Sequence, residues 1–134
     1  MKRFSTLLMA LVAVLFVSCG SSSSPSKVAV KIYKEMAAGK YESIPENYYF
    51  ASDNEEDRQD KEQFLISLCK EKIAPQIERQ GGIKNIEVLD ETISEDGDMA
   101  WVKLLITYGN GETEDDSIRL VLDDNGDWKA VMDK

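Results

Sequence analysis

The spacing of hydrophobic residues changes at Gly81-Gly82, and this change predicts helices before the two glycines and strands after them. From Ser26 to Ala38, apolar residues recur every three or four positions, which is the spacing of one helix face. Ser26 is a suitable N-cap because its hydroxyl can accept a hydrogen bond from the first turn, and Gly39 suits the C-terminal end. We therefore expect a helix over this stretch.

A longer helix is predicted from about Lys61 to Arg79. Its apolar positions are Phe64, Leu65, Leu68, Cys69, Ile73 and Ile77. Pro75 lies inside this stretch and should kink the helix or end it early, because proline has no amide hydrogen and its ring clashes with the preceding turn. Between the two helices, Tyr41–Phe50 predicts a helical turn broken by proline, and residues 51–60 predict a polar loop.

Beyond the two glycines, apolar and polar residues alternate with the period of a strand. Ile83–Ser94 is the first expected strand, and its phase slips between Val88 and Leu89, which indicates a β-bulge. The core-facing residues of the next three strands are expected to be Ala100, Val102, Leu104, Ile106 and Tyr108, then Ile118, Leu120 and Leu122, then Trp128, Ala130 and Met132. The pairs Asn110-Gly111 and Asn125-Gly126 predict the turns between these strands.

Helices followed by an antiparallel meander predict an α+β domain, in which the helices pack on one face of a four-stranded sheet. The opposite face is unusually apolar. The residues that point to it are Trp101, Leu105, Val121 and Val131. A fully solvated face would be more polar, so these four are candidate interface residues for a homodimer or for an envelope protein partner, unless another segment covers them.

The first residues have the pattern of a secretory signal. Two basic residues open the chain, and Leu7–Val17 is an unbroken apolar run that is too short to cross a bilayer as a helix. The next stretch, FVSC at residues 16–19, resembles the lipobox of bacterial lipoproteins, in which the cysteine is acylated and becomes the mature N-terminus. This resemblance implies a signal peptide over residues 1–18 and a palmitate-type lipid on Cys19; the alternative is an ordinary secreted protein.

Residues 19–26 are expected to form the acylated cysteine and a serine-rich tether, because this stretch has nothing to bury. Residues 27–134 are long enough for one domain with a single core. The lipoprotein resemblance implies a lipid-anchored protein of the cell envelope. The lack of an acidic cluster after Cys19 favours the periplasm-facing outer membrane of a Gram-negative bacterium. With Cys19 acylated, Cys69 has no partner for a disulfide and is expected to be a small buried hydrophobe.

The chain is acidic and lacks histidine. It has 25 acidic and 16 basic residues and a formal net charge of −9. This balance argues against nucleic acid as a partner, since phosphate binding needs clustered lysine and arginine. It argues equally against electrostatic attraction to anionic lipid, so the membrane link should be the covalent lipid. The absence of histidine removes the commonest general base, the serine-triad mechanism and most zinc sites.

A family resemblance rests on three stretches: SPSKVAVKIYKEMAAGKYESI (24–44), RQGGIKNIEVLDETIS (79–94) and DNGDWKAV (124–131). They resemble small bacterial lipoprotein domains of unknown function with the cystatin-like fold, also called the nuclear-transport-factor-2-like (NTF2-like) fold. The resemblance implies a curved sheet that wraps around the helices as a cone with an open mouth, often a ligand pocket. It also implies an outer sheet face that often mediates dimers. The fold hosts isomerases, dehydratases and non-catalytic binders, so it implies no function by itself.

The pocket of this fold lies between the helices and the concave sheet face, where Tyr108 should project. The candidate pocket residues are therefore Tyr33, Tyr48, Tyr49 and Tyr108, because tyrosine offers a ligand both apolar contact and a hydroxyl. Filling of the core is the alternative interpretation. Enzymes of the fold use a pocket aspartate with tyrosine or histidine, but histidine is missing and the strand acids are expected on the outward phase or in turns. We assign no catalytic residue.

The acidic stretch Asp123–Asp127 resembles part of a calcium loop, but Gly126 stands at its fourth position instead of the sixth. A hairpin turn is the better interpretation, and no metal or cofactor is expected. We expect a non-catalytic module that binds a small ligand or a peptide. The alternatives are a structural or assembly partner that docks through its outer sheet face and, last, a pocket enzyme of the isomerase or dehydratase type.

Overall fold

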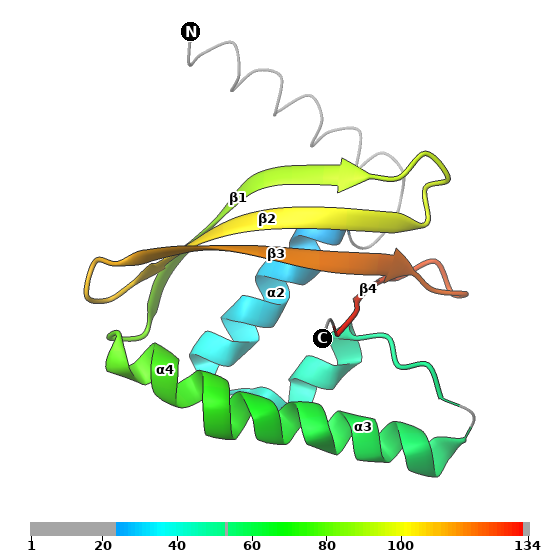
Figure 1. Ribbon diagram of the computed structural model, residues 1–134, viewed down its shortest axis with the longest axis horizontal. Coiled ribbons are helices and arrows are strands. Elements are labelled where there is room, and N and C mark those ends of the chain that lie inside the picture. The colour runs from blue at the N-terminus through cyan, green and yellow to red at the C-terminus, as the bar shows by residue number, and fades with distance from the viewer. Residues whose placement is uncertain (1–23, 53, 133–134) are drawn as a thin grey trace, which may run out of the picture.

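Helices cover one face of an antiparallel sheet (Figure 1). The computed structural model describes residues 24–52 and 54–132. Its helical elements are α2 (Pro25–Ala38), the 3₁₀ helix η1 (Tyr41–Asn47), α3 (Glu55–Leu68), the π-helical turn η2 (Cys69–Ile73) and α4 (Ala74–Arg79). Its strands are β1 (Ile83–Ile93), β2 (Met99–Tyr108), β3 (Thr113–Leu122) and β4 (Trp128–Ala130). They pair in the order β1-β2-β3-β4, so the predicted α+β meander is confirmed.

Helix α2 forms over the predicted stretch but has a different cap. Ser24, not Ser26, is its N-cap, and the Ser24 hydroxyl accepts a hydrogen bond from the Lys27 amide at 3.3 Å. Ser26 instead donates its amide and its hydroxyl to the Glu91 carboxylate of β1. Gly39 ends the helix as predicted, with a φ of 77° that residues with a side chain rarely adopt.

Helix α3 begins at Glu55 and takes up much of the stretch predicted as a polar loop. Asn54 caps it, because its side-chain oxygen accepts a hydrogen bond from the Asp57 amide at 2.7 Å. Acidic residues fill the first turn, where the positive end of the helix dipole stabilises negative charge. Most side chains before Leu65 are exposed, so this half of the helix has no apolar stripe by which its sequence would predict it.

Pro75 alters the long helix without ending it. The π-helical turn Cys69–Ile73 comes immediately before α4, and Pro75 stands in the first turn of α4. In this turn the Ala74 amide bonds back to the Cys69 carbonyl, which is wider than an ordinary helical turn and rearranges the carbonyls that the proline ring would meet. The predicted disturbance thus takes the form of a π-helical turn, and the helix continues to Arg79.

The pairing register sets the two faces of the sheet. All five predicted inward residues of β2 are buried: Ala100, Val102, Leu104, Ile106 and Tyr108. The register of β1 on β2 shifts between Val88 and Asp90, so Leu89 is the extra residue of the predicted bulge. The turn after β2 has a positive φ at Gly111 but not at Asn110, so it is not the two-residue type I′ turn that an Asn-Gly pair favours.

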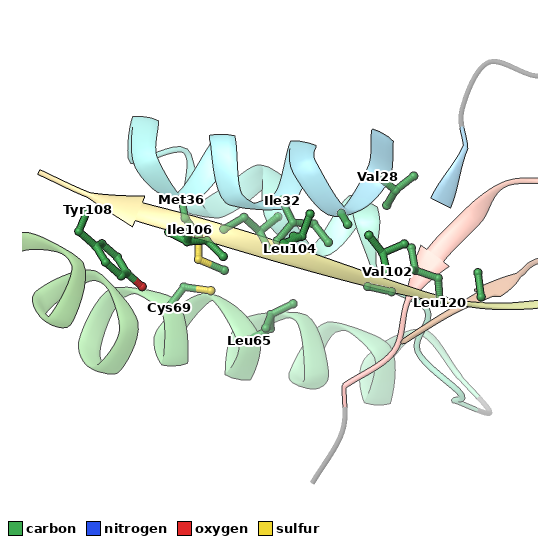
Figure 2. Close-up of a cluster of buried hydrophobic side chains, with 14 residues drawn as sticks. Val28, Ile32, Met36, Leu65, Cys69, Val102, Leu104, Ile106, Tyr108 and Leu120 are labelled. Atoms are coloured by element: carbon green, nitrogen blue, oxygen red, sulfur yellow. The ribbon is translucent and has the colours of Figure 1, made fainter. Parts of the chain in front are cut away.

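The core lies between the inner face of the sheet, helix α2 and the helix formed by α3 and η2 (Figure 2). Its fully buried side chains include Ile32, Ile44, Cys69, Leu104, Ile106 and Leu120. Two residues predicted as core residues are exposed. Phe64 is 59% exposed because it lies on α3 before the helix meets the core, and Leu122 is 38% exposed because it ends its strand.

Candidate functional site

An edge segment runs beside the last strand of the sheet. Tyr48 forms a parallel bridge with Ala130, and the Tyr49 amide donates to the Ala130 carbonyl at 2.8 Å. Within this edge segment, residues 48–51, Tyr48 and Tyr49 thus pair with β4, which is itself only three residues long. The edge segment and residues 131–132, which follow β4, lie next to the N-terminal half of α3.

A groove of about 510 Å³, the edge groove, lies between these three segments. Its lining residues are Tyr49, Phe50, Ala51, Asp60, Lys61, Phe64, Val131 and Met132. Phe64 is 59% exposed and Tyr49 is 46% exposed, so two large aromatic side chains are open to water. A groove of this volume and apolar lining is of the size that holds small organic ligands in proteins.

Charged residues stand at the rim of the edge groove. The Lys61 amino group donates to the Ala51 carbonyl and lies 3.3 Å from the Asp57 carboxylate, so it ties the edge segment to α3. Asp60 is exposed beside it. An apolar floor with charges at its border is suited to holding an amphipathic molecule or an apolar peptide side chain.

The four candidate pocket tyrosines lie in two environments. Tyr33 and Tyr48 are half-buried against the core and Tyr108 is buried within it, whereas Tyr49 lines the edge groove. Tyr48 stacks on Phe50, with ring centroids 6.4 Å apart. Burial raises the pKa of Tyr48 to about 12, so its hydroxyl stays protonated at neutral pH. The structure therefore brings one of the four tyrosines to the groove.

Two of the three acids of β3, Glu114 and Asp116, lie on the inner phase of the strand, so the expectation that strand acids point outward is wrong for these two. Asp116 pairs with Leu104 and Glu114 with Ile106, and both partners are buried. Burial raises the pKa of the Asp116 carboxyl. Glu114 accepts a hydrogen bond from the Tyr108 hydroxyl at 2.6 Å, and burial together with this bond raises the pKa of Tyr108 to about 12. Neither carboxylate lines the edge groove.

On the outer face of the sheet, the side away from the helices, apolar residues alternate with charged ones. Trp101 is 42% exposed, and Leu105, Val121 and Val131 are half-buried. Arg119 pairs with Trp101, and its carbonyl accepts the Val131 amide at 3.0 Å, so Arg119 separates the two in one row across the strands. The four candidate interface residues thus share the outer phase, but Val131 also lines the edge groove.

The predicted signal peptide and the acylation site Cys19 lie outside the described residues. Within residues 24–52 and 54–132, no helix has the length and hydrophobicity to cross a bilayer. In the same ranges, no group of three or more histidine, cysteine, aspartate or glutamate side chains is placed to hold a metal ion. Cys69 is a free thiol that is fully buried, and burial raises its pKa.

The edge groove is the feature that the sequence pattern missed. Its walls come from residues 49–51, 60–64 and 131–132, which only the fold brings together. Helical spacing assigned Phe64 to the core, although the four residues that precede it are all polar. That run of polar residues is the signal that could have placed Phe64 on an exposed part of the helix.

Comparison with known proteins identifies the fold. No curated protein matches the chain. The crystal structure of a Campylobacter jejuni protein described as a candidate NTF2-like transpeptidase superposes with a TM-score of 0.71 at 20% sequence identity, over 83% of this chain and 100% of that one. This likeness shows an NTF2-like fold. The intermembrane space region of the chloroplast protein ARC6 matches at a TM-score of 0.42 and 14% identity, over 84% of this chain and 95% of that one, which is too low to carry an argument.

The sequence also matches one family model, over residues 17–131. That range includes every helix and strand described above. The predicted resemblance to domains of unknown function with the NTF2-like fold is therefore confirmed, while its lipoprotein part stays a prediction. The chain belongs to the family DUF4878, a domain of unknown function.

Proposed function

We propose that this protein is a lipid-anchored, non-catalytic binding module of the cell envelope, which holds a small apolar or amphipathic ligand or a peptide in its edge groove. The observation that carries the proposal is the exposure of Phe64 and Tyr49 at the sides of a groove of about 510 Å³. Apolar surface left open on a small domain usually marks a place of binding. The NTF2-like fold is compatible with this role, since the same fold serves binders as well as enzymes.

The proposed anchor is a lipid on Cys19. It is supported by the basic start of the chain, the short apolar run Leu7–Val17 and the serine-rich stretch that follows the cysteine. The proposed location is the periplasm-facing outer membrane of a Gram-negative bacterium.

The proposal of a non-catalytic role rests on the chemistry around the groove. The chain contains no histidine, and among the described residues the ionisable groups that line the groove are Asp60 and Lys61 at its rim and the phenol of Tyr49. The carboxyl with a raised pKa, Asp116, lies elsewhere on the inner face. General acid–base catalysis needs such a group within hydrogen-bond reach of the reacting atoms, and Asp116 does not line the groove.

A second candidate function is assembly through the outer face of the sheet. It is supported by Trp101, a large aromatic residue that remains 42% exposed on a sheet face. Tryptophan is enriched among the residues that dominate protein interfaces. In this role the domain would pair with a second copy or an envelope protein, and the edge groove would stay open.

The groove is tested with Nile red, a neutral apolar dye whose fluorescence rises on transfer out of water. A polypeptide of residues 24–134, which contains every element of the described core, should bind the dye saturably. Phe64→Gln should weaken binding about tenfold, because burying a phenylalanine contributes about 1.5–3 kcal/mol. The fold should be unaffected, since Phe64 is mostly exposed.

The matched control is Leu122→Gln. Leu122 is also an exposed large apolar residue but does not line the edge groove, so its loss should leave dye binding unchanged. Equal binding by the wild-type protein and Phe64→Gln would contradict the proposal, as would a wild-type protein that does not bind the dye.

A further inference from the structure

Helix α2 carries a stripe of lysines on its exposed side. Lys27, Lys31 and Lys34 follow one another at helical spacing, and all three are exposed. The acid of the helix, Glu35, is mostly buried and accepts a hydrogen bond from the Asn47 side-chain amide at 2.8 Å. A chain with 25 acidic residues thus presents one helix side that is almost entirely positive.

Two further lysines extend this stripe to either side. Shallow hollows flank α2, and they are lined by Lys84 of β1 on one side and by Lys129 of β4 on the other. We call the five residues Lys27, Lys31, Lys34, Lys84 and Lys129 the basic face. The two hollows between α2 and β1 contain no acidic residue, and the hollow near β4 contains Glu46 and Asp127.

The amino groups of the basic face form few interactions with other groups of the described residues. Within residues 24–52 and 54–132, Lys27, Lys34 and Lys84 form no ion pair. Lys31 reaches the Glu35 carboxylate only at 4.0 Å. Lys129 donates to a backbone carbonyl at 2.6 Å, which leaves its charge unpaired. An external anion can therefore bind here without breaking a strong internal interaction.

Helix α2 is also the element that follows the proposed anchor most closely. Ser24 caps the helix, and the five peptide units between it and Cys19 span at most about 18 Å. A lipid on Cys19 would hold the start of the basic face within that distance of the bilayer. At the resulting effective concentration, contacts that are weak in solution become significant. Screening over about 8 Å at physiological ionic strength limits the repulsion from acids elsewhere on the molecule.

We propose that the basic face docks the domain onto anionic lipid headgroups of the membrane that holds its anchor. The inference rests on the proposed acylation of Cys19 and adds an orientation to it. Lysine suits this partner because its amino group is a point charge that any headgroup phosphate can meet. The five lysines spread over three shallow hollows instead of converging on one pocket, which matches a flat surface better than a compact ligand.

The test is lysine footprinting of the processed full chain in vesicles. The protein is purified from bacterial membranes and reconstituted in phosphatidylcholine, or in an equimolar mixture of phosphatidylcholine and phosphatidylglycerol. Brief acetylation followed by mass spectrometry gives the rate at each lysine and the mass of the N-terminus. Lys27, Lys31 and Lys34 should react about fivefold more slowly on the anionic vesicles, since a lysine near such a surface gains about that factor in binding. Lys70 and Lys72 should not change, and high salt should abolish the protection.

Charge-matched variants separate docking from net charge. Lys27→Gln with Lys31→Gln and Lys34→Gln should remove the protection of Lys84 and Lys129. The control variant, Lys70→Gln with Lys72→Gln and Lys103→Gln, removes as much positive charge from other surfaces. It should leave the protection of Lys84 and Lys129 unchanged. An acylated N-terminus without protection would overturn the docking and leave the anchor intact, whereas protection with an unmodified N-terminus would support the docking and refute the anchor. Protection by soluble polyglutamate but not by anionic vesicles would indicate an acidic polypeptide and overturn the lipid proposal.

Discussion

Glu91 joins strand β1 to the start of helix α2 across 65 residues of sequence. Its carboxylate accepts hydrogen bonds from the amide and the hydroxyl of Ser26. The first amides of a helix have no hydrogen-bond acceptor within the helix. The Glu91 carboxylate on the strand supplies such an acceptor for Ser26. The negative charge also lies at the positive end of the helix dipole. One side chain therefore helps to fix where α2 begins on the sheet.

The environment of the Cys69 side chain predicts how fast its thiol reacts. Its side chain is fully buried and burial raises the pKa of the thiol, so little thiolate forms at neutral pH. In a polypeptide of residues 24–134, whose one cysteine is Cys69, iodoacetate should react on the order of 100-fold more slowly under native conditions than in urea, because labelling waits for opening of the structure. Mass spectrometry measures the labelled fraction over time. Rapid native labelling would refute a buried, unreactive thiol.

At the scale of elements, two turns are packed backbone against backbone. The Gly109 amide donates to the Gly82 carbonyl at 2.8 Å, and the Asn110 amide donates to the Gln80 carbonyl at 2.9 Å. These bonds join the turn after α4 to the turn between β2 and β3. A Cβ atom on Gly109 would lie 2.2 Å from the Gly81 carbonyl oxygen, so the contact requires glycine at this position.

Gly109→Ala should therefore destabilise the domain by forcing these two turns apart. We expect a loss of about 3 kcal/mol in the free energy of unfolding, which is the upper end for overpacking of a tight contact. Urea denaturation followed by circular dichroism measures it. In the control Gly97→Ala, the added Cβ meets open space and the cost is the positive φ of 79°, about 1 kcal/mol. Equal losses in both variants would show that the turns separate without strain.

At the scale of the whole molecule, the charges of the outer face are ordered so that the face complements itself. Near the β2–β3 turn, Glu87 and Asp115 lie in the row of Leu105. Toward the other end of the sheet, Arg119 lies in the row of the exposed tryptophan. A two-fold axis through the middle of this face would set the acids of one copy against the arginine of the other, and a symmetric dimer requires a face that complements itself in this way.

Trp101→Lys should abolish the self-association that this arrangement favours. Loss of a tryptophan that dominates an interface costs about 2 kcal/mol or more, so the dimer should be weakened at least about 30-fold. Sedimentation velocity over a range of concentrations measures it, and circular dichroism checks the fold. Leu122→Lys adds the same charge at an exposed apolar residue on the inner phase and should leave the association unchanged. A wild-type domain that stays monomeric at high concentration would contradict this prediction.

Local patterns in the sequence predicted most of the elements. Alternation along β2 predicted each of its buried residues, and the phase slip at Leu89 predicted the bulge, because the side chains of a strand point to opposite faces in turn. The same alternation, carried on through β3, would have placed Asp116 on the inner phase. The phase of the strand, and not the charge of the side chain, therefore sets the side on which Asp116 lies.

The sequence by itself determined the α+β order, the helix and strand phases and the turn at Gly39, since each depends on neighbours within a few positions along the chain. Only the tertiary structure decided the edge groove, the pairing of Ser26 with Glu91 and the gathering of five lysines into one face. Each of these joins segments that are remote in the chain. Their positions depend on how far α3 extends past the core and on how α2 crosses the sheet, and no local periodicity contains that information.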